Sequence, residues 1–299
     1  MPSTLATRAA LLLLLLSTAA GAQQRTKVFI SVDMEGIAGV VTNEQLGPAG
    51  FEYQRFREFM TAEAIAAIEG ARAAGATDIV VADSHGNMQN LLVERLPADV
   101  TVVRGPVRPL GMMQGIDSSF HAVVFIGYHS ATTNLAGVRA HTFASARYTS
   151  VELNGSPAAE STFNAALAGH FGVPVVAISG DESAVAELVA IAPGAASAVV
   201  KQSVGFHAAQ TRTPAAAQAM IREAVRTGVA RRSEVRPYRL QAPYRLDLGF
   251  KSYRASEVLA YLPIVQRTTA HSIRYASESI LDVARFLSFL GAYSPEIDP

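Results

Sequence analysis

The chain has 299 residues, 49% of them hydrophobic, which is enough to bury one large core or two smaller ones. Its 25 basic and 25 acidic residues give a formal net charge of zero, and no basic run is interleaved with aromatic side chains. This balance argues against a nucleic acid or an anionic membrane surface as a partner.

The first 22 residues have the form of a secretory signal peptide. Arg8 gives a positive start, residues 9–16 form an unbroken apolar run, and residues 20–22 match the small-x-small pattern of a cleavage site. A membrane anchor is the alternative, but the apolar run is shorter than the ~20 residues that a spanning helix needs. We therefore expect cleavage after Ala22, no membrane attachment afterwards, and a mature protein that is periplasmic or secreted.

Strand-like and helix-like segments then alternate along the chain. Residues 27–32 form a short β-branched run, and residues 53–74 place apolar side chains at every third or fourth position, as an amphipathic helix does. Ser156-Pro157 has the form of an N-cap followed by proline in the first turn, which predicts a helix through Ala168. The other predicted segments are strands at 78–82, 100–103, 123–127 and 174–179 and a helix at 182–191. This alternation predicts an α/β fold with a mostly parallel sheet and helices on both faces.

The pattern changes after Lys201. Thr213-Pro214 predicts the start of a long alanine-rich helix, which ends close to a cluster of basic residues: Arg231, Arg232 and Arg236. The segments that follow are strands at 244–250 and 264–270 and helices at 256–261 and 279–290. Beyond the signal peptide at 1–22, we therefore expect an α/β domain at 23–206 and a smaller C-terminal α+β domain at 207–299.

Acidic and imidazole side chains follow three of the predicted strands. Asp33 ends the first strand, and Glu35, two residues later, lies on the same side of an extended backbone. His85 follows the second strand, and His129 follows a later one, with His141 twelve residues further along. Because ligands of open parallel sheets bind beyond the carboxyl ends of the strands, these residues are candidates for a single site.

Imidazole and carboxylate ligands suit Zn, Mn, Co or Fe, and the chain has no cysteine to offer instead. The residues alone leave a structural explanation open, since acids can lie on a solvated loop and a histidine can be hydrogen-bonded. Glu160 has its own alternative, because an acid in the first turn of a helix stabilises the helix dipole without a metal. The remaining histidines lie away from the carboxyl ends of strands, and for them we favour structural roles: His121, His170, His207 and His271.

Six short motifs are arranged as in a known enzyme family. They are S-V-D-M-E-G at 31–36, D-S-H-x-x-M-x-N-L at 83–91, G-Y-H at 127–129, G-V-x-x-H at 137–141, N-G-x-P-x-x-E at 154–160 and V-K-Q at 200–202. With them the chain resembles the zinc-dependent D-aminopeptidases that were first associated with a bacterial dipeptide-transport operon. The resemblance runs from about Lys27 to Leu290 and is weakest after Phe206.

The resemblance implies a centre that binds two zinc ions per chain. The family's ligands correspond by motif to five residues of this chain: Asp33, Glu35, His85, His129 and Glu160. Asp33 would bridge the two metals, with Glu35 and His85 on one of them and His129 and Glu160 on the other. His141 would be catalytic and not a ligand. The resemblance also implies hydrolysis of short peptides or amides that begin with a D-amino acid such as D-Ala, and a ring-like homo-oligomer that encloses the active sites.

The chain departs from the family pattern in three places. It carries a predicted signal peptide, which the cytoplasmic relatives lack. The loop from His129 to His141 is one residue longer, and Ala140 precedes the catalytic histidine where relatives often have serine. The first difference concerns where the enzyme works, and the other two concern substrate preference and the placement of His141.

Two other functions stay open at this point. A binuclear hydrolase of phosphoesters would need arginine or lysine near the metals to hold phosphate. Four arginines are candidates for that role: Arg104, Arg108, Arg139 and Arg147. A non-catalytic periplasmic peptide-binding protein would bind peptides without turnover, but it would have no need of a positioned proton carrier such as His141.

Overall fold

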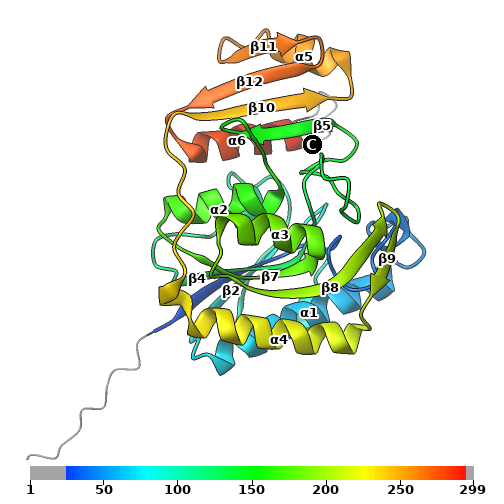
Figure 1. Ribbon diagram of the computed structural model, residues 1–299, viewed down its shortest axis with the longest axis vertical. Helices are drawn as coiled ribbons and strands as arrows, with labels where there is room; N and C mark the ends of the chain where they lie inside the picture. Colours follow the sequence, from blue (N-terminus) through cyan, green and yellow to red (C-terminus); the bar gives the residue numbers. More distant parts are fainter. Residues whose placement is uncertain (1–24, 294–299) are drawn as a thin grey trace, which may run out of the picture.

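A computed structural model describes residues 25–293 of the chain. The larger of its two sheets lies at the centre of the fold (Figure 1). Its seven strands follow the order β3-β2-β1-β4-β7-β8-β9, and only the last pair, β8 and β9, is antiparallel. The strands are β1 (Lys27–Val32), β2 (Asp78–Asp83), β3 (Thr101–Val103), β4 (Ala122–Tyr128), β7 (Val175–Asp181), β8 (Ala196–Gly205) and β9 (Ala208–Thr211). The predicted signal peptide, residues 1–22, lies outside the described residues.

Helices cover both faces of this sheet (Figure 1). α1 (Tyr53–Ala73) and α4 (Pro214–Ala230) pack against each other on one face, and α2 (Glu160–His170) and α3 (Glu182–Ile191) lie on the other. Each face has its own cluster of buried apolar side chains. The predicted α/β fold with a mostly parallel sheet is therefore confirmed, and Thr213 caps α4 as expected by accepting from Ala216 N.

A second sheet of five strands lies beyond α2 and α3, in the order β11-β12-β10-β5-β6 (Figure 1). All of its pairs are antiparallel. Its strands are β5 (Tyr148–Leu153), β6 (Ser156–Pro157), β10 (Tyr244–Phe250), β11 (Val265–Thr269) and β12 (Ser272–Ser277). The sheet carries α5 (Tyr253–Leu259) on its outer part, and α6 (Ile280–Ala292) packs between it and α2. The apolar cluster on the α2 face continues through α6 into this sheet.

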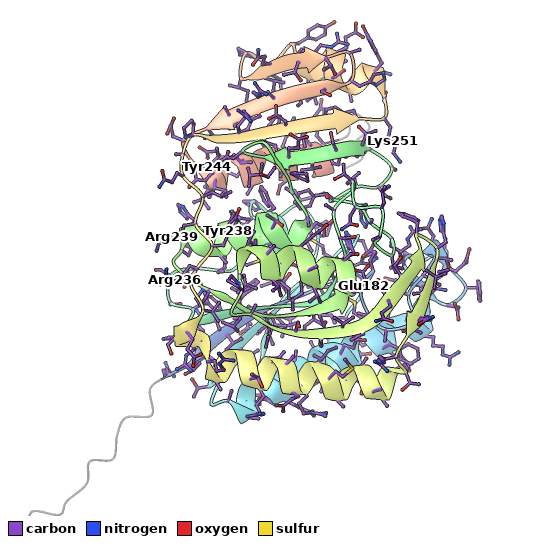
Figure 2. The ribbon with its side chains drawn as sticks, viewed as in Figure 1. Glu182, Arg236, Tyr238, Arg239, Tyr244 and Lys251 are labelled. Carbon is purple, nitrogen blue, oxygen red and sulfur yellow. The ribbon has the colours of Figure 1, made fainter. Side chains whose placement is uncertain are left out.

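Sheet membership does not change at the predicted boundary after residue 206. β9 and α4 follow that residue, yet they belong with the larger sheet, whereas β5 and β6 precede it and belong to the second sheet. The chain passes from α4 to β10 through the segment from Arg236 to Tyr244, which runs along the side of the molecule in Figure 2. This segment packs against α2 closely enough that a Cβ at Gly169 would lie 1.7 Å from Tyr238 O.

The helix start predicted at Ser156-Pro157 is wrong. These two residues form β6 and pair with β5, and α2 begins only at Glu160. The reason is the Asn154-Gly155 turn, in which both residues have positive φ, 54° and 82°. Asn-Gly with two positive φ values is the preferred two-residue β-hairpin connection, so the chain returns as a strand before it enters the helix. The helix predicted at 256–261 also begins earlier, at Tyr253.

Short 3-10 helices complete the described elements: η1 (Asn43–Gln45), η2 (Val93–Arg95), η3 (Gly111–Met113) and η4 (Arg232–Glu234). No helix within residues 25–293 combines the length and the apolar character needed to cross a membrane.

The strand order places three carboxyl ends side by side. β1 pairs with β2 on one side and with β4 on the other, so that Val32 lies beside both Asp83 and Ile126. After β1 the chain adds β2 and β3 on one side of it and then crosses to add β4 on the other side, which makes the carboxyl end of β1 a topological switch point. In open α/β sheets that is where ligands bind.

Candidate metal centre

All six residues predicted for the site line one cavity of about 130 Å³ at this switch point: Asp33, Glu35, His85, His129, His141 and Glu160. Asp33, His85 and His129 lie just beyond the carboxyl ends of β1, β2 and β4. Glu160 is the first residue of α2, and His141 comes from the loop after β4. Five of the six are buried, and the side chain of His141 is 12% exposed.

Asp33 lies at the centre of the cluster, with a histidine on each side. Its Oδ1 is 3.3 Å from His85 Nδ1, and its Oδ2 is 3.3 Å from His129 Nε2. A second carboxylate accompanies each histidine: Glu35 Oε2 is 2.8 Å from His85 Nδ1, and Glu160 Oε1 is 3.4 Å from His129 Nε2. The cluster therefore has two halves, each with one histidine and one glutamate, and they share Asp33.

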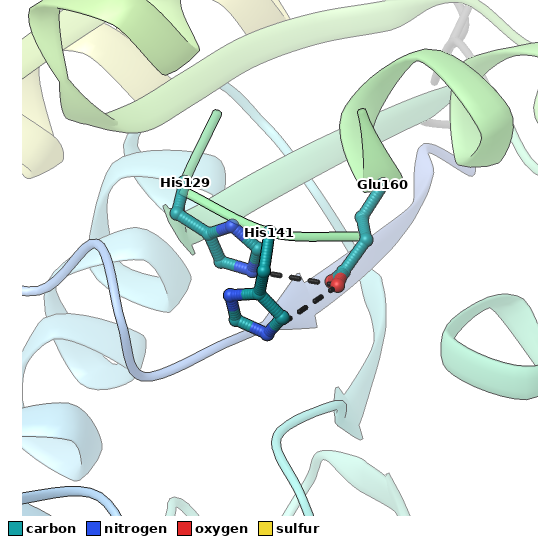
Figure 3. Close-up of side chains that lie close together, drawn as sticks. All are labelled: His129, His141 and Glu160. Atoms are coloured by element: carbon teal, nitrogen blue, oxygen red, sulfur yellow. Dashed lines mark ion pairs between the residues drawn. The ribbon is translucent and has the colours of Figure 1, made fainter. Parts of the chain in front are cut away.

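His141 stacks on His129, with ring centroids 4.0 Å apart and planes 6° from parallel. Both rings face Glu160, as Figure 3 shows. His141 Nε2 is 4.0 Å from Glu160 Oε1 and 3.8 Å from Glu35 Oε1. Two overlapping groups have ligand atoms within 4.8 Å of one another: Asp33, Glu35 and His129, and His129, His141 and Glu160. The geometry thus permits a ligand role as well as a catalytic role for His141, and the catalytic assignment stays a prediction.

A backbone carbonyl accepts from the outer nitrogen of each histidine. The pairs are His85 Nε2 with Leu46 O at 2.7 Å, His129 Nδ1 with Ser130 O at 3.1 Å and His141 Nδ1 with Arg139 O at 2.8 Å. A carbonyl oxygen can only accept, so the outer nitrogen carries the proton and a neutral ring turns its lone pair into the cavity. Histidine ligands of metals are oriented in this way.

Three buried atoms in the cavity wall have no hydrogen-bond partner among the described residues: Asp33 Oδ2, Glu35 Oε2 and His129 Nε2. Within the set, lone pairs of imidazole nitrogen and carboxylate oxygen face one another at 2.8–3.4 Å. Such an arrangement is costly unless a proton or a metal cation lies between the atoms. Because the donors are nitrogen and oxygen without sulfur, the residues fit a divalent ion of the zinc, manganese, cobalt or iron group.

Without metal, the surroundings within the cluster raise the pKa values of Asp33, His85 and His129 above their usual values. Burial raises the pKa of Asp33, and the charge of Glu35 raises it further. Burial alone would lower the pKa of His85, but attraction to the nearby carboxylates of Glu35 and Asp33 outweighs it, so this pKa lies well above its usual value. The pKa of His129 is raised in the same way, mainly by Glu160. A metal must displace these protons, so the affinity for metal should fall as the pH is lowered.

Gly36 lets the loop that carries Glu35 pack against the end of β4. Its N–H donates to Gly127 O at 2.7 Å, and a Cβ at Gly36 would lie 2.0 Å from Tyr128 O. Any side chain at this position must therefore push the backbone of the loop away from the strand that carries His129.

We expect Gly36→Ala to displace Glu35 and to lower the free energy of unfolding by ~1–3 kcal/mol, the usual cost of overpacking. Thermal unfolding and metal content of the purified variant measure the two effects. Gly47→Ala is the matched control, since a Cβ at Gly47 meets no atom within 4 Å. A Gly36→Ala protein as stable as the Gly47→Ala protein, with the same metal content, would contradict this packing argument.

Lys201, the lysine of the V-K-Q motif, holds the loop behind Glu35 in place, a role that the sequence does not reveal. It is 1% exposed, and its ammonium donates to the carbonyl oxygens of Glu35, Ile37 and Val40. Burial lowers its pKa to about 8. Three carbonyls match the three N–H donors of an ammonium, so Lys201 fixes the loop behind Glu35. The one signal in the sequence is a lysine directly after the apolar run of β8.

Asp83, the first residue of the D-S-H-x-x-M-x-N-L motif, does not line the cavity but binds the last two residues of the motif. Its carboxylate accepts from the backbone N–H groups of Asn90 and Leu91 and from the amide of Asn90, whose side chain also donates to His85 O. These bonds close the loop that presents His85. The four other histidines lie outside the cavity, and the structural role predicted for His121 is visible, because its Nδ1 accepts from Lys27 N at 3.1 Å.

Comparisons with known proteins identify the family of this chain. A family model described as D-aminopeptidase matches residues 26–289. A curated D-aminopeptidase of Bacillus subtilis (strain 168) is 32% identical over 260 residues, which is 86% of this chain and 93% of the relative. The solved structure of DppA from Bacillus subtilis, described as a zinc-dependent D-aminopeptidase and a self-compartmentalizing protease, is similar with a TM-score of 0.85 at 28% identity. That match covers 91% of this chain and 100% of the other. The chain belongs to the D-aminopeptidase family.

Proposed function

We propose that the protein removes an N-terminal D-amino acid, such as D-Ala, from short peptides or amides, and that it does so with two zinc ions. Their ligands would be Asp33, Glu35, His85, His129 and Glu160. The observation that carries this proposal is the position of Asp33, whose two carboxylate oxygens each lie 3.3 Å from a different histidine. Membership of the D-aminopeptidase family and the zinc dependence of the similar solved structure support it.

Zinc bound at such a site polarises the scissile carbonyl and lowers the pKa of water towards ~7. The protein's own contribution is orientation and proton transfer. His141 holds its Nδ1 proton against Arg139 O and turns Nε2 towards Glu35 and Glu160. From there it can take a proton from the attacking water, give one to the leaving amine, or donate to the developing oxyanion.

A peptide substrate fits the cavity better than a phosphoester does. None of the four candidate arginines lines the 130 Å³ cavity that the metal ligands surround. Arg139 donates to Asn43, and its guanidinium lies 4.8 Å from the Phe206 ring centroid, so it attracts Glu35 without lining the cavity. Arg104 is exposed. Arg108 and Arg147 line only the adjoining larger cavity, so a phosphoryl group held at the metals would find no arginine in the wall of the smaller one.

A set of four substrates tests the proposal: D-Ala-D-Ala, L-Ala-L-Ala, D-Ala amide and p-nitrophenyl phosphate. We expect turnover of the two D-Ala substrates in the presence of zinc, and little turnover of the other two. Preferred turnover of the phosphoester would favour the phosphoesterase alternative. Tight binding of D-Ala-D-Ala without release of D-Ala would favour a binding protein.

We also propose that the chain forms a ring-like homo-oligomer, by analogy with the relative described as self-compartmentalizing. Several large apolar side chains are strongly exposed in the single chain and could be covered by other copies: Phe51, Val107, Leu135 and Tyr261. Light scattering of the purified protein measures the mass of the particle, and a monomer at assay concentration would contradict the proposal.

Export of the protein remains a proposal based on residues 1–22. We expect the mature chain to begin at Gln23 and to occur outside the cytoplasm. Intact-mass measurement on protein from a fractionated host tests both expectations. A chain that begins at Met1 in the cytoplasmic fraction would contradict them.

A further inference from the structure

A second and larger cavity, of about 510 Å³, adjoins the metal centre. The two cavities share four wall residues: Gly86, Met88, Met112 and Phe143. The rest of the larger cavity is lined mainly by apolar side chains, among them Leu110 directly before η3, Phe163 of α2, and Ala284 and Leu287 of α6. Its volume is in the range of pockets that bind small molecules, so a substrate at the metals has an apolar space beside it.

This apolar space contains two cations, Arg108 and Arg147, and neither forms an ion pair with a carboxylate within residues 25–293. Arg147 is exposed and donates to Leu290 O. Arg108 is only 7% exposed, and its Nε donates to Gly105 O at 2.6 Å while Nη2 donates to Asp83 O. Its remaining nitrogen, Nη1, is buried without a partner in the described part of the chain. A guanidinium stays protonated, so Arg108 is a buried positive charge with an unused donor.

Arg108 is hydrogen-bonded to the carboxyl end of β2, the strand that precedes the proposed metal ligand His85. The carbonyl that accepts from its Nη2 belongs to Asp83, two residues before His85. The carboxylate of Asp83 attracts Arg108 through space but accepts from Asn90 and Leu91, so it offers no hydrogen bond to the guanidinium. The guanidinium is thus held at a fixed place in the wall of the larger cavity, hydrogen-bonded to the strand end that precedes His85.

The backbone at this junction is strained. Met88 and Phe143, which line both cavities, have φ values of 57° and 61°, and Val107, directly before Arg108, has a φ of 61°. Residues other than glycine rarely adopt such values, and a β-branched residue almost never does. Strain of this kind collects at ligand sites, where the surrounding structure holds it in place.

We propose that the larger cavity binds the leaving residue of a short peptide, and that Arg108 binds the free C-terminal carboxylate of that residue. This inference rests on the proposed function, since the scissile bond must lie at the metals. The apolar wall accepts a small side chain such as that of alanine. A carboxylate supplies both the acceptor for Nη1 and a negative charge in direct contact with the guanidinium, and a charge-assisted bond to guanidinium is among the stronger hydrogen bonds in proteins. The enzyme should therefore prefer dipeptides with a free carboxylate over their amides.

The test compares D-Ala-D-Ala with D-Ala-D-Ala amide, which differ only at the carboxylate. For the parent protein, kcat/KM should be at least about tenfold higher for the free dipeptide, as expected for the loss of a hydrogen bond to a charged group. In Arg108→Met, the ratio of the two kcat/KM values should fall towards one. Arg285→Met is the matched control, since Arg285 lies on α6, is exposed and pairs with Asp282 outside the cavity.

Comparison within the parent protein needs no variant, so the inference can be tested even if Arg108→Met does not fold. Equal turnover of both substrates by the parent would overturn the carboxylate site and leave the proposed function standing. An Arg108→Met protein that keeps the parent ratio would also overturn it. Turnover of neither substrate by the zinc-loaded parent would overturn the proposed function and this inference together.

Discussion

Asp33→Ala is expected to lose both metal ions and all measurable peptidase activity. Each oxygen of Asp33 faces a different histidine, His85 or His129, at 3.3 Å, so a single substitution removes a carboxylate oxygen from both halves of the cluster. Loss of a partner that only orients a ligand costs about 10- to 100-fold in metal affinity or activity. Loss of a ligand shared by two ions should cost more than that. Mass spectrometry of metal content, with turnover of D-Ala-D-Ala, measures the effect.

Two further variants make this result specific to Asp33. Removing His85 or His129 alone should empty one half of the cluster and leave metal in the other. Asp99→Ala is the control for loss of an aspartate, because Asp99 is exposed and pairs with Arg72 on the surface. A full metal complement in Asp33→Ala would show that Asp33 does not bridge.

His141→Ala is expected to keep most of its metal and to lose at least a hundredfold in turnover of a D-Ala amide. The threshold comes from the ~10²–10⁴ that general acid–base catalysis usually contributes. The physical reason is that His141 Nε2 points towards Glu35 and Glu160, while the five other residues already provide two acid–histidine pairs around Asp33. Metal content, thermal stability and turnover are measured on the same preparation.

The stacking of His141 on His129 makes the opposite result informative. If metal and activity are lost together, His141 is a ligand, as its closeness to His129 and Glu160 would allow. If turnover is unchanged, it has neither role. His271→Ala is a suitable control, because His271 is exposed in the turn between β11 and β12, where it contacts Tyr253.

The carboxyl ends of β1, β2 and β4 were predictable because each apolar run is followed within three residues by an acid or a histidine. Asp33, His85 and His129 follow directly from that pattern and from the rule that ligands gather at such ends. Glu160 did not follow from the residues alone. An acid at a helix start has its own explanation, and the Asn154-Gly155 hairpin moved the start of α2 by several residues.

The supporting parts of the site depend on long-range contacts that no local pattern records. The carbonyl of Leu46 that orients His85 comes from a loop 39 residues away, and Lys201 reaches the loop of Glu35 from 166 residues along the chain. β5 and β12 were missed for a similar reason, since both are short, partly exposed strands whose place is set by pairing with β10. The larger cavity exists only because α6 of the second sheet packs against α2 and η3.

The most direct measurement is a zinc titration of the metal-free protein. The purified protein is stripped with a chelator, zinc is added in known amounts, and release of D-Ala from D-Ala-D-Ala is followed beside release of L-Ala from L-Ala-L-Ala. We expect no activity without metal, recovery that saturates at about two zinc ions per chain, and a strong preference for the D-substrate throughout. Full activity in the stripped protein, or equal recovery on the two substrates, would contradict a metal-dependent D-aminopeptidase.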